Sequence, residues 1–228
     1  QAILNQSAGT RCGKGAHAPK DAWDFMIEAV IIRRAETEWN AAGLYLGRTD
    51  VPVGQTGMEE LQKAVVHPEV RRVFASPMLQ PANGESAIPN AELVLLNGLR
   101  EMDFGDFEGL AGEEIANSPS LRSACEQWKK GGREASCPNG ESVAKLAERV
   151  LRPLTARDEA REGERVYVAT HGCVIMALMS LFAGSIEEFL SFRVLNLHGY
   201  AATVDQTTWK RHRRFLAYAA YSALDEGV

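Results

Sequence analysis

The sequence has few cysteines, no excess of basic residues and no long apolar run. Its four cysteines are scattered without a C-x-x-C pair, which argues against a disulfide scaffold or a thiolate zinc site and indicates a reducing cytoplasm. The 30 acidic and 25 basic residues give a net charge of −5, unlike a general nucleic-acid binder. No apolar run approaches the roughly 18 residues that a membrane span needs. We therefore expect neither nucleic acid nor membrane as a partner.

The first 25 residues differ from the rest of the chain. They show no sustained hydrophobic periodicity and no apolar segment of a secretory signal. The glycine-rich stretch at 9–15 fails as a phosphate-binding P-loop, because its glycines are too close, no Ser or Thr follows Lys14 and no strand precedes it. We expect residues 1–25 to form a disordered extension and residues 26–228 a single domain, which is large enough to bury a core without disulfides or metal.

Short apolar, β-branched runs alternate with amphipathic helical segments along the rest of the chain. The apolar runs predict strands at residues 27–32, 72–75, 92–96, 165–170 and 200–204. Helical spacing predicts helices at residues 57–66, 113–130, 142–157 and 174–182. A polar loop is expected at 33–56, and the prolines within 80–90 allow only a short or broken helix there. This alternation is typical of a three-layer α/β/α fold with a mostly parallel central sheet.

Conspicuous polar residues follow two of the predicted strands. Arg33 and Arg34 come at the end of the first strand, and His171 and Gly172 stand between the strand at 165–170 and a helix. Ligands of open α/β sheets bind beyond the carboxyl ends of the strands, and a helix start favours an anion such as phosphate. A histidine that only caps the helix fits this local pattern equally well.

Six short motifs occur in order along the chain. They read IIRRAETEWN at 31–40, YLGRTDVP at 45–52 with TG at 56–57, SPML at 76–79, LREMDFGDFEG at 99–109, NGES at 139–142 and HG at 171–172. Together they resemble the signature of the histidine phosphatase (phosphoglycerate mutase-like) superfamily, which opens with L-V-R-H-G-E-T-x-x-N. The resemblance spans residues 27 to about 205 and is nearest to α-ribazole-phosphatase-like members. It implies the fold expected above and no metal or organic cofactor.

The resemblance also implies a phosphohistidine mechanism. The histidine of the R-H-G motif attacks phosphorus, two arginines, an asparagine and a second histidine bind the phosphoryl oxygens, and a glutamate protonates the leaving oxygen. Arg33 corresponds to the first arginine and Asn40 to the asparagine. Glu101 corresponds to the acid and His171 to the second histidine.

Each of these assignments has a structural alternative. Arg33 could pair with a surface carboxylate, and Asn40 could shape its own turn. Asp103, Asp106 and Glu108 lie close to the expected acid in sequence and could suggest a metal site. No histidine accompanies these acids, and the family chemistry uses no metal.

Three positions depart from the family pattern. Arg34 occupies the position of the nucleophile, with Ala35 in place of the glycine, and arginine has no lone pair with which to form a phosphoenzyme. Gln80 stands where a second phosphate-binding arginine is expected, and it can donate a hydrogen bond but no positive charge. Loss of a nucleophile costs on the order of 10⁴ to 10⁶ in turnover, so we expect an impaired phosphatase, a pseudoenzyme.

Three functions remain open from the sequence. The first is an impaired phosphatase that keeps a pocket for a small phosphorylated metabolite or inorganic phosphate. The second is an active phosphomonoesterase in which His171 replaces the nucleophile, and the third is a binding or regulatory module. The expected phosphate-binding residues are Arg33, Arg34, Asn40, Gln80, His171 and Gly172. The sequence does not indicate an oligomeric state.

Overall fold

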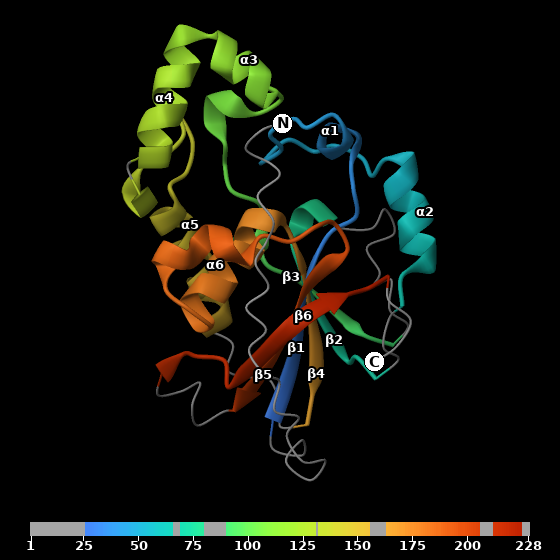
Figure 1. Cartoon of the computed structure of the whole chain (residues 1–228). Helices are drawn as coiled ribbons and strands as arrows, with labels where there is room; N and C mark the ends of the chain where they lie inside the picture. The colour runs from blue at the N-terminus through green and yellow to red at the C-terminus, as the bar shows by residue number, and fades with distance from the viewer. Residues whose placement is uncertain are drawn as a thin grey trace.

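The computed structural model describes residues 26–65, 69–79, 90–130, 132–155, 163–205 and 212–224. Its strands form one sheet (Figure 1). They are β1 (Met26–Arg33), β2 (Arg72–Ala75), β3 (Glu92–Leu95), β4 (Arg165–Thr170), β5 (His198–Asp205) and β6 (Ala217–Ser222).

The order of strands across the sheet is β3-β2-β4-β1-β5-β6. The pairs β3–β2, β2–β4 and β4–β1 are parallel, whereas β5 runs antiparallel to both of its neighbours, β1 and β6. Every strand of this sheet except β5 therefore points in one direction. The sheet is mixed, and the prediction that it is mostly parallel is confirmed.

The five predicted strands are all present, and β2 and β4 have the predicted bounds. These two strands carry buried Val, Phe and Tyr side chains, and such residues fit a pleated, buried surface. The sequence pattern does not predict β6, whose Ala-Tyr-Ala-Ala-Tyr-Ser run lacks β-branched residues and is largely exposed. β6 is a strand because its backbone pairs with β5, from Thr203↔Ala217 to His198↔Ser222, and this contact cannot be read from the local sequence pattern.

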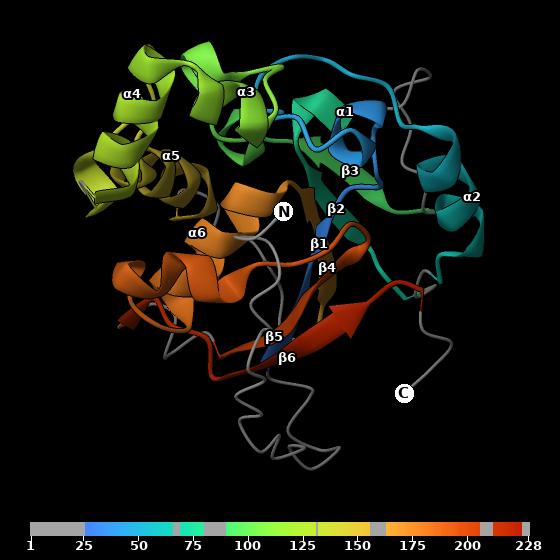
Figure 2. The same cartoon turned by 45° about the horizontal axis from the view of Figure 1, so that its top comes forward.

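Helices lie on both sides of the sheet (Figures 1 and 2). The α-helices are α1 (Glu38–Ala41), α2 (Gln55–Lys63), α3 (Gly112–Asn117), α4 (Pro119–Lys130), α5 (Val143–Thr155) and α6 (Gly172–Phe182). The 3₁₀ helices are η2 (Pro77–Leu79), η3 (Asn97–Leu99), η4 (Gly105–Phe107), η5 (Gly132–Glu134) and η6 (Ile186–Phe192). In both views α5 and α6 lie on one side and α2 on the other, which gives three layers. Of the described helices, none is long and apolar enough to span a membrane.

Two helical predictions are wrong in detail. The single helix expected at 113–130 is divided into α3 and α4, because Ser118 adopts extended angles (φ −92°, ψ 116°) directly before Pro119. A proline disfavours helical angles in the residue before it, yet it suits the first turn of a new helix. The loop expected at 33–56 contains the short α1, which begins with a capping box between Thr37 and Asn40.

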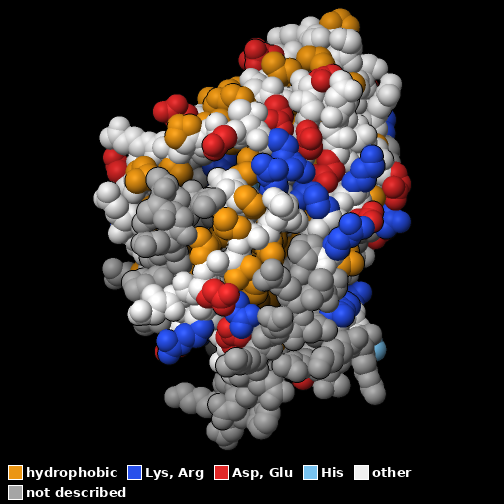
Figure 3. Space-filling view, turned by 180° about the vertical axis from the view of Figure 1, so that it is seen from behind, with side chains coloured by type: hydrophobic (Ala, Val, Ile, Leu, Met, Phe, Trp, Pro, Cys, Tyr) orange, Lys and Arg blue, Asp and Glu red, His pale blue; other side chains and the backbone are white. Residues whose placement is uncertain are grey.

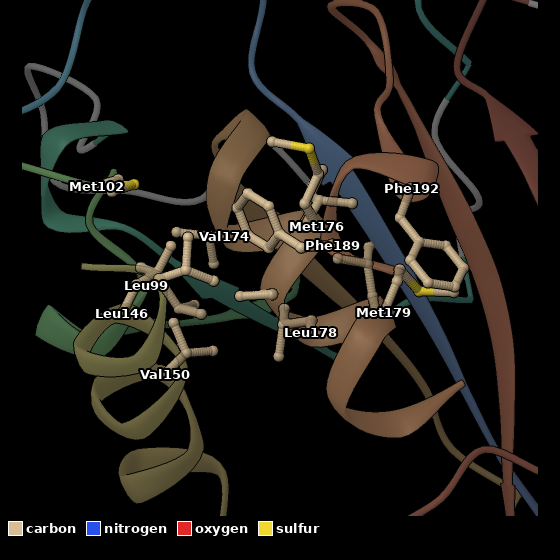
Figure 4. Packing of buried hydrophobic residues seen from close by; sticks show 14 of the residues in the cluster. Leu99, Met102, Leu146, Val150, Val174, Met176, Leu178, Met179, Phe189 and Phe192 are labelled. Carbon is tan, nitrogen blue, oxygen red and sulfur yellow. The ribbon is translucent and has the colours of Figure 1, made fainter. Parts of the chain in front are cut away.

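The main core lies between the sheet and the pair α5 and α6 (Figure 4). Leu146 and Val150 of α5 meet Val174 of α6, and all three side chains are fully buried. Leu99 and Met102, at the end of η3 and just beyond it, are also fully buried in this cluster. Each such side chain stabilises the fold by roughly 1.5–3 kcal/mol, so the loop after η3 is held firmly at the sheet edge.

Several predictions fall outside the described residues. They concern the extension at 1–25, the broken helix at 80–90 apart from its last residue, and the side chain of Gln80. These stay predictions from the sequence.

Candidate functional site

The carboxyl ends of the adjacent parallel strands β2, β4 and β1 bring three sequence segments together. Arg33 and Thr170 are direct partners in the register of β1 and β4, so Arg34 and His171 leave the sheet side by side. The backbone N–H of Arg34 donates to the Thr170 carbonyl oxygen at 2.9 Å, and the N–H of Ser76, after β2, bonds to β4 in the same way. This edge is where an open α/β sheet binds ligands.

His171 lies in the centre of this edge and is only 3% exposed. It precedes α6, but its side chain makes no capping hydrogen bond and instead places Nε2 2.9 Å from Ser76 Oγ. The same hydroxyl oxygen also accepts the backbone N–H of Met78 at 3.3 Å, so Ser76 connects His171 to the turn after β2. Burial, together with the positive charges of Arg34 and Arg33, lowers the pKa of His171 to about 3. The imidazole is therefore neutral at physiological pH.

The guanidinium of Arg33 lies at the start of α6. Its Nη1 donates to the Val194 carbonyl oxygen at 2.8 Å, a backbone partner rather than a surface carboxylate. A Cβ placed on Gly172 would stand 3.5 Å from Arg33 Nε and 3.8 Å from Glu101 Oε2, so Gly172 lies beside both charged groups. Burial lowers the pKa of Arg33, and the nearby Glu101 opposes that shift.

Arg34 is fixed by its own neighbours. Its Nη1 donates to the Ala35 carbonyl oxygen at 2.8 Å, while its carbonyl oxygen accepts from Asn196 Nδ2 at 3.0 Å. Burial and the adjacent charge of Arg33 lower the pKa of Arg34 to about 10. This guanidinium is still protonated at neutral pH, so the site holds two neighbouring positive charges.

Glu101 is buried at 7% exposure beside these arginines. Its Oε1 accepts the Met102 N–H at 2.8 Å, and its Oε2 accepts the Cys173 N–H at 3.2 Å. Burial raises the pKa of Glu101, although both backbone bonds and the charge of Arg33 oppose the rise. A carboxyl group with a raised pKa is suited to donating a proton.

Arg149 of α5 holds the segment that leads to Glu101. Its Nη1 donates to the carbonyl oxygens of Gly98 at 2.8 Å and Arg100 at 3.0 Å, and its Nη2 donates to that of Glu101 at 3.3 Å. Its Nε and Nη2 also bond the two carboxylate oxygens of Glu141 at 2.8 and 2.9 Å. No local pattern in the sequence predicts a role for Arg149, Glu141 or Ser76, although Glu141 lies in the NGES motif and Ser76 in the SPML motif.

The structure brings five of the predicted site residues together: Arg33, Arg34, Glu101, His171 and Gly172. The hydrogen bonds of Asn40 are made within its own turn. Its Oδ1 accepts from the N–H and the hydroxyl of Thr37 at 3.4 and 3.1 Å, as in the turn-shaping alternative.

The acidic residues that follow Glu101 do not converge on a common point. Asp103 accepts from the Gly105 N–H, Asp106 from the Asn139 amide, and Glu108 from the N–H groups of Arg48 and Thr49. Within the described ranges, no three His, Cys, Asp or Glu side chains are placed to hold a metal ion.

Comparison with known proteins gives a single family. The family model described as "Histidine phosphatase superfamily (branch 1)" matches residues 29–215. The "uncharacterized phosphatase PhoE" of Bacillus subtilis (strain 168) is 26% identical over 177 residues, which cover 75% of this chain and 85% of the relative. "Phosphoglycerate mutase-like protein 4" of Arabidopsis thaliana is 28% identical over 160 residues, covering 66% and 69%.

Solved structures agree on the fold. The α-ribazole phosphatase of Shigella flexneri superposes with a TM-score of 0.64 at 23% identity, over 79% of this chain and 90% of that one. The phosphoglycerate mutase of Thermus thermophilus gives a TM-score of 0.58 at 27% identity, over 86% and 99%. The α/β fold expected from the motifs is thus confirmed.

Proposed function

The chain belongs to the histidine phosphatase superfamily, and on that premise we propose that it binds a small phosphorylated metabolite or inorganic phosphate without efficient turnover. The single observation that carries this proposal is Arg34. Where an active relative has a histidine that forms a bond to phosphorus, this chain has a protonated guanidinium whose pKa is about 10. It has no lone pair to offer, so the phosphoenzyme cannot form there.

Binding, in contrast, is supported by the charges that remain. Arg33 and Arg34 are adjacent and partly desolvated, and an anion between them would relieve their mutual repulsion. The start of α6 at Gly172 adds the positive end of a helix dipole at the same edge, although the Cys173 N–H is already donated to Glu101 Oε2. These features suit a phosphate dianion, the group common to the substrates of phosphatases and mutases.

A second candidate, hydrolysis with His171 as the nucleophile, is favoured by the neutral state of that imidazole, because a neutral ring keeps one lone pair. The hydrogen bond between Nε2 and Ser76 Oγ counts against it, since this nitrogen is already engaged with the hydroxyl. Attack by Nε2 on phosphorus would require that hydrogen bond to break first.

Calorimetric titration with inorganic phosphate tests the proposal. We expect binding in the millimolar range or tighter, and at least about tenfold weaker binding in Arg33→Met and Arg34→Met, because each removes a charge-assisted donor. Arg122→Met is the matched control, since Arg122 is exposed on α4. No heat of binding at millimolar phosphate would overturn the proposal, and phosphate-ester turnover that is lost in His171→Ala would replace it with the second candidate.

We also propose that the protein works in a reducing cytoplasm. Cys125, Cys137 and Cys173 are free, and the first two are buried. Burial raises the pKa of the Cys137 and Cys173 thiols, which keeps them protonated and slow to oxidise. Thiol titration of denatured protein, isolated without reductant, should find these thiols free; a disulfide among them would contradict this setting.

A further inference from the structure

Strand β6 forms one end of the sheet and is exposed there. In the order β3-β2-β4-β1-β5-β6 its one described neighbour is β5, and both cartoon views show it at the end of the sheet (Figures 1 and 2). The first four residues of its Ala-Tyr-Ala-Ala-Tyr-Ser run are exposed. An edge strand presents a row of unpaired N–H and C=O groups, which can bind a further strand.

The sequence of β6 does nothing to block such pairing. Proteins protect sheet edges with charged side chains, proline or bulges, and β6 contains no charged residue and no proline. The strand at the other end, β3, is shorter and begins with the exposed Glu92, whose carboxylate lies 3.8 Å from Arg72 Nε. Charged side chains of both signs are interspersed on the face seen from behind (Figure 3). β6 therefore lacks the protection that a sheet edge normally carries.

The register between β5 and β6 determines which backbone groups point outward. The Ala223 N–H donates to the Leu197 carbonyl oxygen at 2.9 Å, so these two residues form a hydrogen-bonded pair. Such pairs alternate along antiparallel strands, which directs the backbone groups of Tyr218, Ala220 and Ser222 away from β5. No described residue supplies a backbone partner for these three. Their N–H and C=O groups are thus left for a further strand.

These outward groups are complementary to a second copy of themselves. Two β6 strands can lie antiparallel about a twofold axis at Ala220, so that Ala220 faces the partner's Ala220 and Tyr218 faces the partner's Ser222. Each facing pair is then a hydrogen-bonded pair, which exchanges two backbone bonds. The small alanine side chains let the strands approach at the axis. A symmetric contact of this kind closes after two copies.

The charges on either side of β6 favour the same arrangement. The exposed Arg214 precedes Tyr218 by four residues, and Glu226 follows Ser222 by four residues in the sequence. Antiparallel pairing of Tyr218 with the partner's Ser222 therefore brings Arg214 opposite the partner's Glu226, by count along the chain. Opposite charges at facing strand positions stabilise pairing, whereas a parallel copy would bring like charges together.

Exposed apolar side chains accompany this edge. Leu216, just before β6, is 53% exposed, and Tyr218 is 44% exposed. The Tyr218 ring packs edge-on against the rings of Phe192 and Tyr200, each with a centroid separation of 6.1 Å. These contacts hold the ring in place before any partner binds. A large aromatic side chain that is already fixed is well suited to a protein interface.

We propose that the protein forms a homodimer in which the β6 strands of two copies pair antiparallel and join two sheets into one. This interaction goes beyond the proposed function, because β5 and β1 lie between β6 and the strand that leads to His171. A six-residue strand is only about 20 Å long, so its contact is smaller than the roughly 800 Å² per partner of a standard interface. We therefore expect a reversible dimer with a Kd of about 1–100 μM.

Sedimentation velocity of the full chain at low ionic strength, from about 1 to 300 μM, tests the proposal. We expect a monomer–dimer equilibrium in the wild type. Ala220→Lys places two positive charges at the twofold axis and should weaken dimerisation at least about tenfold. Ala116→Lys makes the same change at an exposed position of α3 and should leave dimerisation unchanged. The two variants should have the same Tm, since Ala220 is also exposed.

The charge pair gives a second test that leaves the strand itself unaltered. Arg214→Glu and Glu226→Arg should each weaken dimerisation, because each brings like charges opposite one another. An equimolar mixture of these two variants should dimerise as the wild type does, since both facing pairs are again of opposite charge. A wild type that stays monomeric at the highest concentration, a dimer that Ala220→Lys does not weaken, or a mixture that dimerises no better than its components would overturn the proposal. The affinity for inorganic phosphate should be the same in all these variants, so the dimer and the proposed function can fail separately.

Discussion

Replacing Arg149 by methionine should destabilise the protein strongly. The substitution keeps an unbranched apolar stem but removes the hydrogen bonds to Gly98, Arg100 and Glu101 and the paired bonds to Glu141. The Glu141 side chain is only 11% exposed, so its carboxylate would lose its main counter-charge in a poorly solvated place.

The size of the effect follows from that geometry. Removal of one partner of a buried ion pair typically costs about 3–5 kcal/mol, because the other charge remains buried. In a domain of this length, 1 kcal/mol lowers the Tm by roughly 2–4 °C. We therefore expect Arg149→Met to lower the Tm by about 6–20 °C in differential scanning calorimetry at pH 7.

Arg122→Met makes the same chemical change at an exposed site of α4 and should move the Tm by no more than about 2 °C. The double variant Arg149→Met/Glu141→Gln should recover part of the loss, since it removes the unpaired carboxylate. If Arg149→Met is as stable as Arg122→Met, the idea that Arg149 holds the Glu101 segment is refuted.

Two further predictions concern pH and backbone strain. Folding lowers the pKa of His171 from its ordinary 6.5 to about 3. Between pH 6.5 and pH 3, this histidine is therefore protonated in the unfolded state and neutral in the folded state. The free energy of unfolding consequently decreases as the pH drops through this range. From pH 7 to 4.5 the wild type should lose about 2–3 kcal/mol more than His171→Gln in urea unfolding, and equal losses would contradict the assignment. Gly105 has φ +52°, and a Cβ there would overlap the Pro138 carbonyl oxygen, so Gly105→Ala should cost at least about 1–3 kcal/mol. Gly112→Ala, in open space at the start of α3, should cost nothing measurable in the same urea titration; equal stability of the two variants would refute the clash.

The fold was predictable where burial and local sequence agree. In β4, the side chains of residues 166–168 are buried on both faces of the sheet, and the run has the bounds that its pattern predicts. The exposed β6 has no such pattern, because its place depends on backbone bonds to β5 rather than on its own side chains. The division between α3 and α4 was also readable, since Pro119 is a local signal that the helical spacing masked.

The site was predictable only in part. The predicted strand ends are sufficient to bring Arg33, Arg34 and His171 together, because neighbouring parallel strands have their carboxyl ends at the same edge of the sheet. Glu101 came only from the resemblance, since nothing local connects it to β1. Ser76 lies 95 positions from its partner His171, and no periodicity predicts a contact across that separation. The presence of that serine in the SPML motif was the one available signal.

Hydrolysis of p-nitrophenyl phosphate tests the central claim most directly, namely that Arg34 keeps a phosphate site from transferring phosphate. The wild type is measured beside a triple variant that restores the family pattern, Arg34→His/Ala35→Gly/Gln80→Arg. We predict that the wild type turns over at least about 10⁴-fold more slowly than the triple variant, the cost of a missing nucleophile. Comparable rates for the two proteins would contradict the account.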